Sequence, residues 1–248
     1  PVKNFFAFLR YLKVPGLGKA ANVILLAKLK LGLGEPKGGQ TALEYLKERG
    51  IDGESIKVFW EPFCVSALNT TCAGASAKLM VSTLRKSVLS GGESGILYFP
   101  ETAVIDAFIP RAVTYLESVG AEICLSDRVE EIEIKNGRFE SIKTAKRGRV
   151  EFRNCVSALP AKVFANMLPE ASALRAEIGD IKSTDIINVY FTTDRKLTDG
   201  DYACLVGSKL HWIFDHTRKS KECEKDGTYL YGATISDAKI PFEAENIR

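Results

Sequence analysis

The spacing of apolar residues changes once along this chain, and that change limits the folds it can adopt. Over the first hundred residues, apolar side chains recur mainly every three or four positions, which is the period of an amphipathic helix. From Ile96 onward they occur mostly in short runs, and Val129 to Ile134 alternates apolar with acidic residues. Helices followed by groups of strands predict an α+β fold, with a helical N-terminal region and antiparallel or mixed sheets.

Five helical segments are predicted over residues 2–118, and a further helix is predicted after the loop Ser157 to Ala161. Their boundaries follow from Pro15-Gly16, which ends the first helix, and from Thr41 and Glu44, which form a capping box at the start of the third. The predicted segments are 2–13, Lys19 to Leu31, Thr41 to about Glu48, Ser55 to Val88 and about Val104 to Ser118.

Two groups of strands follow. Asn136-Gly137 is a strong signal for a two-residue hairpin, and it joins strands predicted at Val129 to Ile134 and Phe139 to Thr144, with a third at Val150 to Val156. Turn residues then separate four more strands, for which we predict an antiparallel meander. These strands are Ile187 to Thr192, Tyr202 to Val206, Leu210 to Asp215 and Thr228 to Ile235.

Composition excludes several classes of function. A net charge of +3 over 248 residues is too small to indicate nucleic-acid binding without a localised basic patch. The six cysteines contain no C-x-x-C pair, so reduced thiols are expected rather than zinc ligands or disulfides, and no metal site is predicted. No apolar stretch is long enough for a spanning helix. We expect a cytoplasmic protein, either soluble or peripheral on the inner face of the cell membrane.

Motifs for phosphate binding and hydrolysis are weak. Gly16 to Ala21 has the spacing of a dinucleotide fingerprint, but a helix rather than a strand is predicted before it. Gly34 to Thr41 has the glycine spacing of a P-loop, yet Gln40 stands where the phosphate-binding lysine is required. His211 and His216 are placed on opposite faces of a strand, and no serine lies in a nucleophile-elbow sequence. No catalytic residue is assigned.

The aromatic residues allow two interpretations. Ordinary packing in the core is one, and a cavity for an isoprenoid is the other, because alkenes offer nothing to hydrogen-bond and are recognised by area and π contact. The candidates for contact with such a substrate are Trp60, Phe63, Phe99, Tyr190 and Trp212.

Three blocks of sequence carry a family resemblance. The first contains Trp60 and Pro62, then Leu68-Asn69-Thr70 and Ala75-Ser76-Ala77, and another is His211-Trp212-Ile213-Phe214-Asp215. These resemble the W-x-P…L-N-T…A-S-A block and the W-[VI]-F-D strand of the squalene-associated FAD-dependent desaturases, the hydroxysqualene dehydroxylase family. The run from Gly120 to Ile132 is similar to the wider flavin amine oxidase and phytoene desaturase superfamily. The first block adds Asn69 to the candidate substrate residues.

The resemblance implies an FAD-dependent oxidoreductase of bacterial squalene and hopanoid synthesis, in which reduced FAD delivers a hydride to hydroxysqualene as its hydroxyl departs. It implies an amine oxidase-like architecture, with residues 1–118 and 166–248 as the substrate-binding domain and 119–165 as a returning part of the FAD-binding domain. Contacts with FAD would then come from Val129 and from the loop Ser157, Ala158, Leu159 and Pro160.

The glycine-rich strand and helix that hold the FAD pyrophosphate, and the family's C-terminal Gly-Asp segment, are not found in these residues. We therefore expect an excised piece of a longer protein that binds FAD weakly on its own and is inactive alone. Two alternatives stay open. One is a carotenoid desaturase or amine oxidase-like enzyme, and the other is a non-catalytic lipid-binding module attached to a membrane through residues 1–31.

Overall fold

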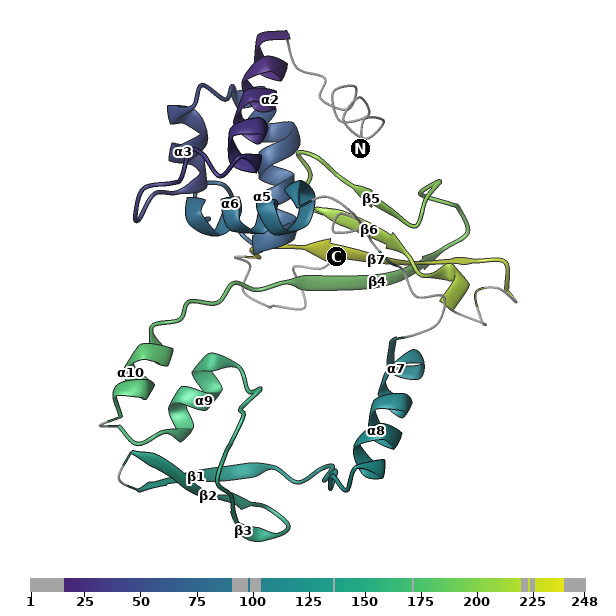
Figure 1. The fold of residues 1–248 in the computed structure, drawn as a ribbon. Helices are drawn as coiled ribbons and strands as arrows, with labels where there is room; N and C mark the ends of the chain where they lie inside the picture. Colours follow the sequence, from purple (N-terminus) through teal and green to yellow (C-terminus); the bar gives the residue numbers. More distant parts are fainter. Residues whose placement is uncertain are drawn as a thin grey trace. The chain divides into compact units, whose positions relative to one another are not determined.

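The computed structural model describes residues 16–90, 98, 104–135, 137–170, 172–219, 223 and 226–238 (Figure 1). The chain forms two compact units. The first unit combines Pro1–Thr102 with Thr184–Arg248, and the second is Ala103–Ser183. The predicted helix over 2–13 and the candidate Phe99 lie outside the described residues.

The helical half of the first unit is built on a buried apolar cluster that includes Tyr45, Trp60 and Met80, each fully buried. The capping box predicted at Thr41 is confirmed, because its hydroxyl accepts from the Glu44 backbone N–H and the Glu44 carboxylate accepts from the Thr41 N–H. The helices are α2 (Gly16–Lys30), α3 (Ala42–Glu48), α4 (Gly53–Ser55), α5 (Glu61–Leu68) and α6 (Ala77–Leu84), with π-helical turns η1 (Ile56–Trp60) and η2 (Arg85–Leu89).

The helical region predicted from Ser55 to Val88 is interrupted, so the prediction of one segment was wrong in this respect. Asn69 ends α5 in the left-handed conformation, with φ of 52°. Ser76 then starts α6 as its N-cap, accepting a hydrogen bond from the Leu79 N–H. Both residue types favour such ends because their short polar side chains satisfy backbone groups left free by the helix.

The other half of the first unit is a four-stranded antiparallel sheet of order β4-β7-β6-β5. The strands are β4 (Ile187–Thr193), β5 (Tyr202–Cys204), β6 (Trp212–Asp215) and β7 (Tyr229–Ile235), and a short 3-10 turn, η3 (Thr217–Lys219), follows β6. The meander prediction was right for β5, β6 and β7 but wrong for β4. β4 pairs with β7 along seven residues, and the residues of the turns do not predict this non-local contact.

The second unit carries a three-stranded antiparallel sheet of order β1-β2-β3. Lys135 pairs with Arg138 across the predicted hairpin turn, where Gly137 has φ of 73°. The third strand begins two residues earlier and ends five residues sooner than predicted. The elements are α7 (Val104–Ala107), α8 (Ile109–Ser118), β1 (Val129–Lys135), β2 (Arg138–Thr144), β3 (Gly148–Glu151), α9 (Ala161–Met167) and α10 (Ala173–Gly179).

The observed α+β fold, with helices and antiparallel sheets, confirms the predicted fold class. The segment 119–165 lies inside the second unit, which also contains α7, α8 and α10. The predicted division, with residues 1–118 and 166–248 for substrate and 119–165 for FAD, stays a prediction.

Candidate functional site

One row of the first unit's sheet runs across all four strands. Tyr190 on β4 is opposite Gly232 on β7, Gly232 is opposite Phe214 on β6, and Phe214 is opposite Tyr202 on β5. Directly opposite residues in a sheet point to the same side. Tyr190, Phe214 and Tyr202 therefore share one face, and Gly232 leaves a gap between the first two.

Two further rings extend this row into a continuous surface. Trp212 lies two residues before Phe214 on β6, and their ring centroids are 6.2 Å apart. The His216 ring lies 6.5 Å from Phe214 and 5.7 Å from Tyr190. Tyr202 is 5.8 Å from Trp212 and 6.3 Å from Phe214. We call this surface the aromatic face, formed by Tyr190, Tyr202, Trp212, Phe214 and His216.

Gly232 is a packing requirement of the aromatic face. A β-carbon built on it would lie 2.9 Å from the Nε2 atom of His216 and 3.1 Å from Cε1 of Tyr190. Both distances are shorter than ordinary van der Waals contact, so a larger residue would force the rings apart. The gap is filled by the two neighbouring rings.

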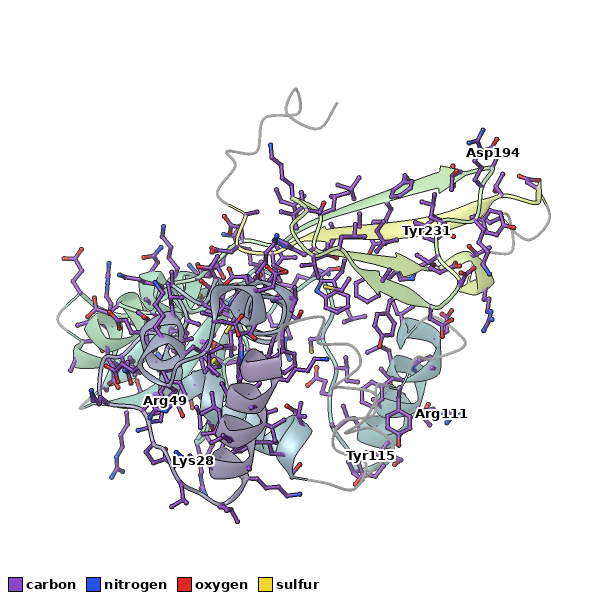
Figure 2. All side chains as sticks on the ribbon, turned by 90° about the horizontal axis from the view of Figure 1, so that it is seen from above. Lys28, Arg49, Arg111, Tyr115, Asp194 and Tyr231 are labelled. Atoms are coloured by element: carbon purple, nitrogen blue, oxygen red, sulfur yellow. The ribbon has the colours of Figure 1, made fainter. Side chains whose placement is uncertain are left out.

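The two sides of the sheet differ in exposure. On the side opposite the aromatic face, Tyr231 is fully buried and Ala233 is 2% exposed. The hydroxyl of Tyr231, whose residue is labelled on the sheet in Figure 2, accepts a hydrogen bond of 2.9 Å from the Leu197 N–H. On the aromatic face, Tyr190 is 66% exposed. One side of the sheet is thus buried at Tyr231 and Ala233, whereas the aromatic face exposes Tyr190 and Tyr202 and keeps Trp212, Phe214 and His216 half-buried.

A cavity of about 390 Å³ adjoins the aromatic face at Trp212, between α5 and the ends of β5 and β6. Its size is within the range of small-molecule sites. Burial raises the pKa of the Cys204 thiol, which keeps it protonated at neutral pH. The cavity is lined by Lys57, Glu61, Pro62, Val65, Thr71, Cys204, Leu205, Val206, Gly207, Ser208, His211, Trp212, Ser236 and Asp237.

His211 is held in place at the wall of this cavity. The Nδ1 atom of its ring accepts a 3.0 Å hydrogen bond from the Ser236 backbone N–H. The backbone N–H of His211 donates to the Thr234 carbonyl. A ring that accepts at Nδ1 carries its proton at Nε2 when it is neutral. His211 can therefore donate from Nε2, whereas His216 lies among the rings of the aromatic face.

Polar residues of the first sequence block hold the sheet against the helices. The Trp212 indole N–H donates to the Ser66 hydroxyl of α5 at 3.0 Å. Asn69 donates to the Thr184 hydroxyl at 2.6 Å and accepts from the Asp237 N–H at 3.1 Å. It therefore joins the end of α5 to the residues just before β4 and just after β7. A role for Asn69 in substrate contact stays a prediction, while its structural role is direct.

Trp60 has a different position from Trp212. It is fully buried in the helical core, where its indole N–H donates to Oδ1 of Asn22 at 2.7 Å. Asn22 is itself buried and donates to the Ser55 hydroxyl at 2.8 Å. Phe63 is half-buried against the same core. Of the predicted aromatic candidates that the structure describes, Tyr190 and Trp212 are brought together, and Trp60 and Phe63 pack with the helices.

The predicted FAD contacts lie in the second unit. Val129 opens β1 and is paired with Thr144 of β2. The loop Ser157 to Pro160 is exposed, and the neighbouring Val156 is 95% exposed. Contact of these residues with FAD stays a prediction.

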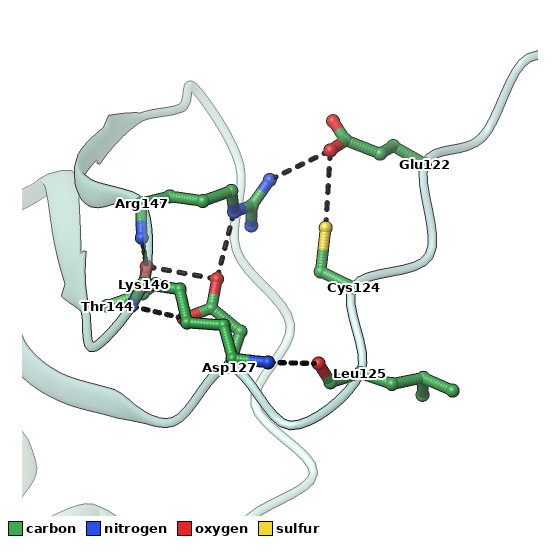
Figure 3. A network of polar contacts seen from close by, with 7 residues as sticks. All are labelled: Glu122, Cys124, Leu125, Asp127, Thr144, Lys146 and Arg147. Carbon is green, nitrogen blue, oxygen red and sulfur yellow. Dashed lines mark hydrogen bonds and ion pairs between the residues drawn. The ribbon is translucent and has the colours of Figure 1, made fainter.

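A polar network braces the turn before β1 (Figure 3). The Asp127 carboxylate accepts from the Lys146 N–H at 2.9 Å, from the Arg147 Nε at 2.9 Å and from the Thr144 hydroxyl at 3.1 Å. The backbone donor of Lys146, followed by the Arg147 and Thr144 side chains, holds the pKa of Asp127 below its usual value. Its side chain is only 4% exposed, so its charge is fixed in place next to the start of β1.

The Gly16 to Ala21 motif, which has the spacing of a dinucleotide fingerprint, does not form a phosphate site. Gly18 lies inside α2, and the Asp52 carboxylate packs directly against it. Hydrogen bonds from the Ser55 backbone and side chain hold the pKa of Asp52 below its usual value. A fixed negative charge at that position opposes pyrophosphate binding.

Sequence reasoning missed Tyr202, Phe214, His216 and Gly232. The period of two in Trp212-Ile213-Phe214 was a usable signal, since it places the tryptophan and the phenylalanine on one face. The pairing of β4 with β7, which brings Tyr190 and Gly232 to that face, had no local signal.

Known proteins give the site a context. No family model matches the chain. A curated hydroxysqualene dehydroxylase from Zymomonas mobilis is 27% identical over 162 residues, covering 62% of this chain. The chain spans about a third of that relative, 36% of its length. The resemblance predicted from the sequence blocks is thus confirmed as a similarity.

Solved structures agree in fold. An oxidoreductase from Methanosarcina mazei superposes with a TM-score of 0.69 at 17% identity, over 94% of this chain and 55% of its own. A variant of putrescine oxidase, from work on its cofactor binding, superposes with a TM-score of 0.66 at 16% identity, over 92% and 54%. The predicted amine oxidase-like architecture is therefore confirmed as a fold. Within the described ranges, no helix is both long and apolar enough to cross a bilayer.

Proposed function

We propose that this chain supplies the substrate-binding surface of an FAD-dependent oxidoreductase that acts on a long isoprenoid, most specifically the reductive dehydroxylation of hydroxysqualene to squalene. The observation that carries the proposal is the aromatic face. It offers five adjacent rings on one side of a sheet, next to a cavity with hydrogen-bonding groups.

The chemistry of the proposed substrate matches this arrangement. An isoprenoid arm has only apolar and π surface, so rings can hold it through burial of area, at roughly 25 cal/mol per Å² removed from water. Its single hydroxyl needs a polar partner. The cavity beside Trp212 provides candidates in the Nε2–H of His211 and in Lys57.

The resemblance to the curated hydroxysqualene dehydroxylase supports the choice of reaction. In that reaction the C–O bond to the hydroxyl breaks and a C–H bond forms at the same carbon, with the oxygen leaving as water. FAD, when bound in its reduced form as FADH₂, would supply the hydride and the proton that the departing hydroxyl takes up to become water. The residues of this chain would hold the hydrocarbon, orient the hydroxyl and keep water away from the reacting carbon.

The second unit contains the residues that the family resemblance assigns to the cofactor. Val129 at the start of β1 is the candidate for contact with its adenosine portion. The exposed loop Ser157 to Pro160 is the candidate for a segment that passes close to the cofactor. The polar network at Asp127 would keep the approach to β1 rigid. The pyrophosphate would need donors other than Gly18, which is blocked by Asp52.

Product analysis with the full-length protein tests the proposal. Purified protein with reduced flavin is incubated with hydroxysqualene, and with phytoene under oxidising conditions in parallel. The expected result is squalene from hydroxysqualene and no desaturated product from phytoene. Desaturation of phytoene without squalene formation would assign the protein to the carotenoid desaturases instead. Binding of either lipid with no turnover would leave only a lipid-binding module.

A further inference from the structure

The end of α2 and the turn after it expose apolar side chains on a rigid support. Ile24 is 54% exposed, Leu31 is 75% exposed and Leu33 is 56% exposed. Gly32 and Gly34 flank Leu33 with φ of 76° and 78°, a conformation that glycine adopts without strain. Three large aliphatic side chains so close in sequence therefore face outward together with this turn.

Hydrogen bonds fix the turn to the helical core. The Leu33 N–H donates to the Lys28 carbonyl at 2.9 Å. The fully buried Tyr45 donates its hydroxyl to the Gly34 carbonyl at 2.7 Å, and Arg49 donates to the same carbonyl at 3.2 Å. The exposure of the leucines is thus a feature of an anchored turn and costs little ordering entropy when a partner binds.

Two cations lie beside these apolar residues. Lys28 and Arg49, both labelled in Figure 2, line a hollow of about 660 Å³ together with Ile24 and Gly34. Arg49 lies over the Tyr45 ring, with its guanidinium carbon 3.5 Å from the centroid.

The acidic groups nearby are already paired. Glu48 lines the same hollow, but its carboxylate binds Lys37 at 3.2 Å. Glu35, in the turn itself, pairs with Arg85. In the described part of the chain, neither Lys28 nor Arg49 forms an ion pair with a carboxylate. The surface therefore has a net positive charge next to exposed aliphatic groups, because Lys28, Lys37 and Arg49 outnumber the single carboxylate of Glu48 at the hollow.

We propose that this surface, formed by Ile24, Lys28, Leu31, Leu33 and Arg49, docks the protein on a membrane that contains anionic phospholipids. The aliphatic side chains enter the boundary between headgroups and acyl chains, and the two cations bind lipid phosphates at the hollow. This combination of a small apolar tip and adjacent positive charge is complementary to an anionic bilayer. The inference does not depend on which lipid the aromatic face accepts.

Vesicle flotation with the full 248-residue chain tests it. Vesicles of phosphatidylcholine alone are compared with vesicles containing phosphatidylglycerol at low and physiological salt. The expected result is flotation with the anionic vesicles that weakens as salt increases. The double substitution Leu31→Ser with Leu33→Ser, and separately Lys28→Glu, should each lower the partition coefficient about tenfold or more.

Leu79→Ser is the matched control, because Leu79 is 54% exposed on α6 and is not part of the proposed surface. Circular dichroism of each variant checks that the fold is kept, as expected for exposed positions. Deletion of residues 1–15 should leave most of the binding intact. Unchanged flotation of the Leu31/Leu33 variant, or complete loss on deletion of residues 1–15, would overturn the proposal.

Discussion

Gly232 on β7 leaves room for the ring of Tyr190 on β4, whose Cε1 atom is 3.1 Å from the place where a β-carbon would stand. The two residues are direct partners in the sheet. The aromatic face therefore depends on the absence of one side chain as much as on the presence of five rings.

Replacing this glycine should disturb the face measurably. We expect Gly232→Ala to lower the free energy of unfolding by about 1–3 kcal/mol, since Tyr190 and His216 must both move. Urea unfolding measures the change. Gly53→Ala is the control, because a β-carbon at Gly53 meets nothing within 4 Å and its φ is ordinary. Equal stability of Gly232→Ala and the wild type would contradict the packing described.

The two tryptophans should behave differently on substitution. Trp60→Phe removes a buried N–H from Asn22, so we expect it to destabilise the first unit by roughly 2–4 kcal/mol. Trp212→Ala should cost less stability but raise the KM for the isoprenoid in the full-length protein. Urea unfolding and steady-state kinetics of both variants separate the roles. A raised KM for Trp60→Phe with unchanged stability would restore Trp60 as a substrate contact.

Asn69 should be a sensitive point for the attachment of the sheet to the helices. Asn69→Ala loses the bonds to Thr184 and Asp237 and places alanine at a φ of 52°, so we expect a loss of about 2–3 kcal/mol in unfolding free energy. Asn69→Gly allows the same backbone conformation without strain. It should therefore be more stable than Asn69→Ala by the strain energy alone, while still lacking the hydrogen bonds of the asparagine. If both variants unfold like the wild type in urea, Asn69 does not anchor the sheet.

Asp127 makes the stability of the second unit depend on pH. Its pKa is lowered in the folded state, so the stabilisation is complete above the unfolded value, near 3.9, and is lost as the pH falls through the folded value. We expect the unfolding midpoint of Asp127→Asn to fall less steeply than that of the wild type as the pH is lowered. Glu117→Gln serves as the comparison, since Glu117 is on the exposed surface of α8. An unchanged pH dependence in Asp127→Asn would show that other carboxylates control it.

Local features of the sequence predicted local features of the fold. The capping box at Thr41, the hairpin turn before Arg138 and the strand Trp212–Asp215 each follow from residue chemistry within a few positions. The break at Asn69 was missed because continuous apolar periodicity on both sides concealed a left-handed residue.

The site was predicted less completely than the elements. Tyr190 and Trp212 were identified by residue type, but composition could not distinguish them from the core residue Trp60. That distinction depends on the long-range pairing of β4 with β7, across about forty residues, which places Tyr190 on the open side of the sheet. The role of Gly232 depends on the same pairing.

The most direct measurement concerns where the substrate lies. The full-length protein is photolysed with an isoprenoid alcohol that carries a diazirine on its hydrocarbon arm, and the adducts are located by peptide mass spectrometry. Our account predicts adducts on β4 and β6, at Tyr190, Trp212 or Phe214, which excess hydroxysqualene suppresses. Adducts that hydroxysqualene suppresses but that lie only in the helical core around Trp60, with none on the aromatic face, would contradict it.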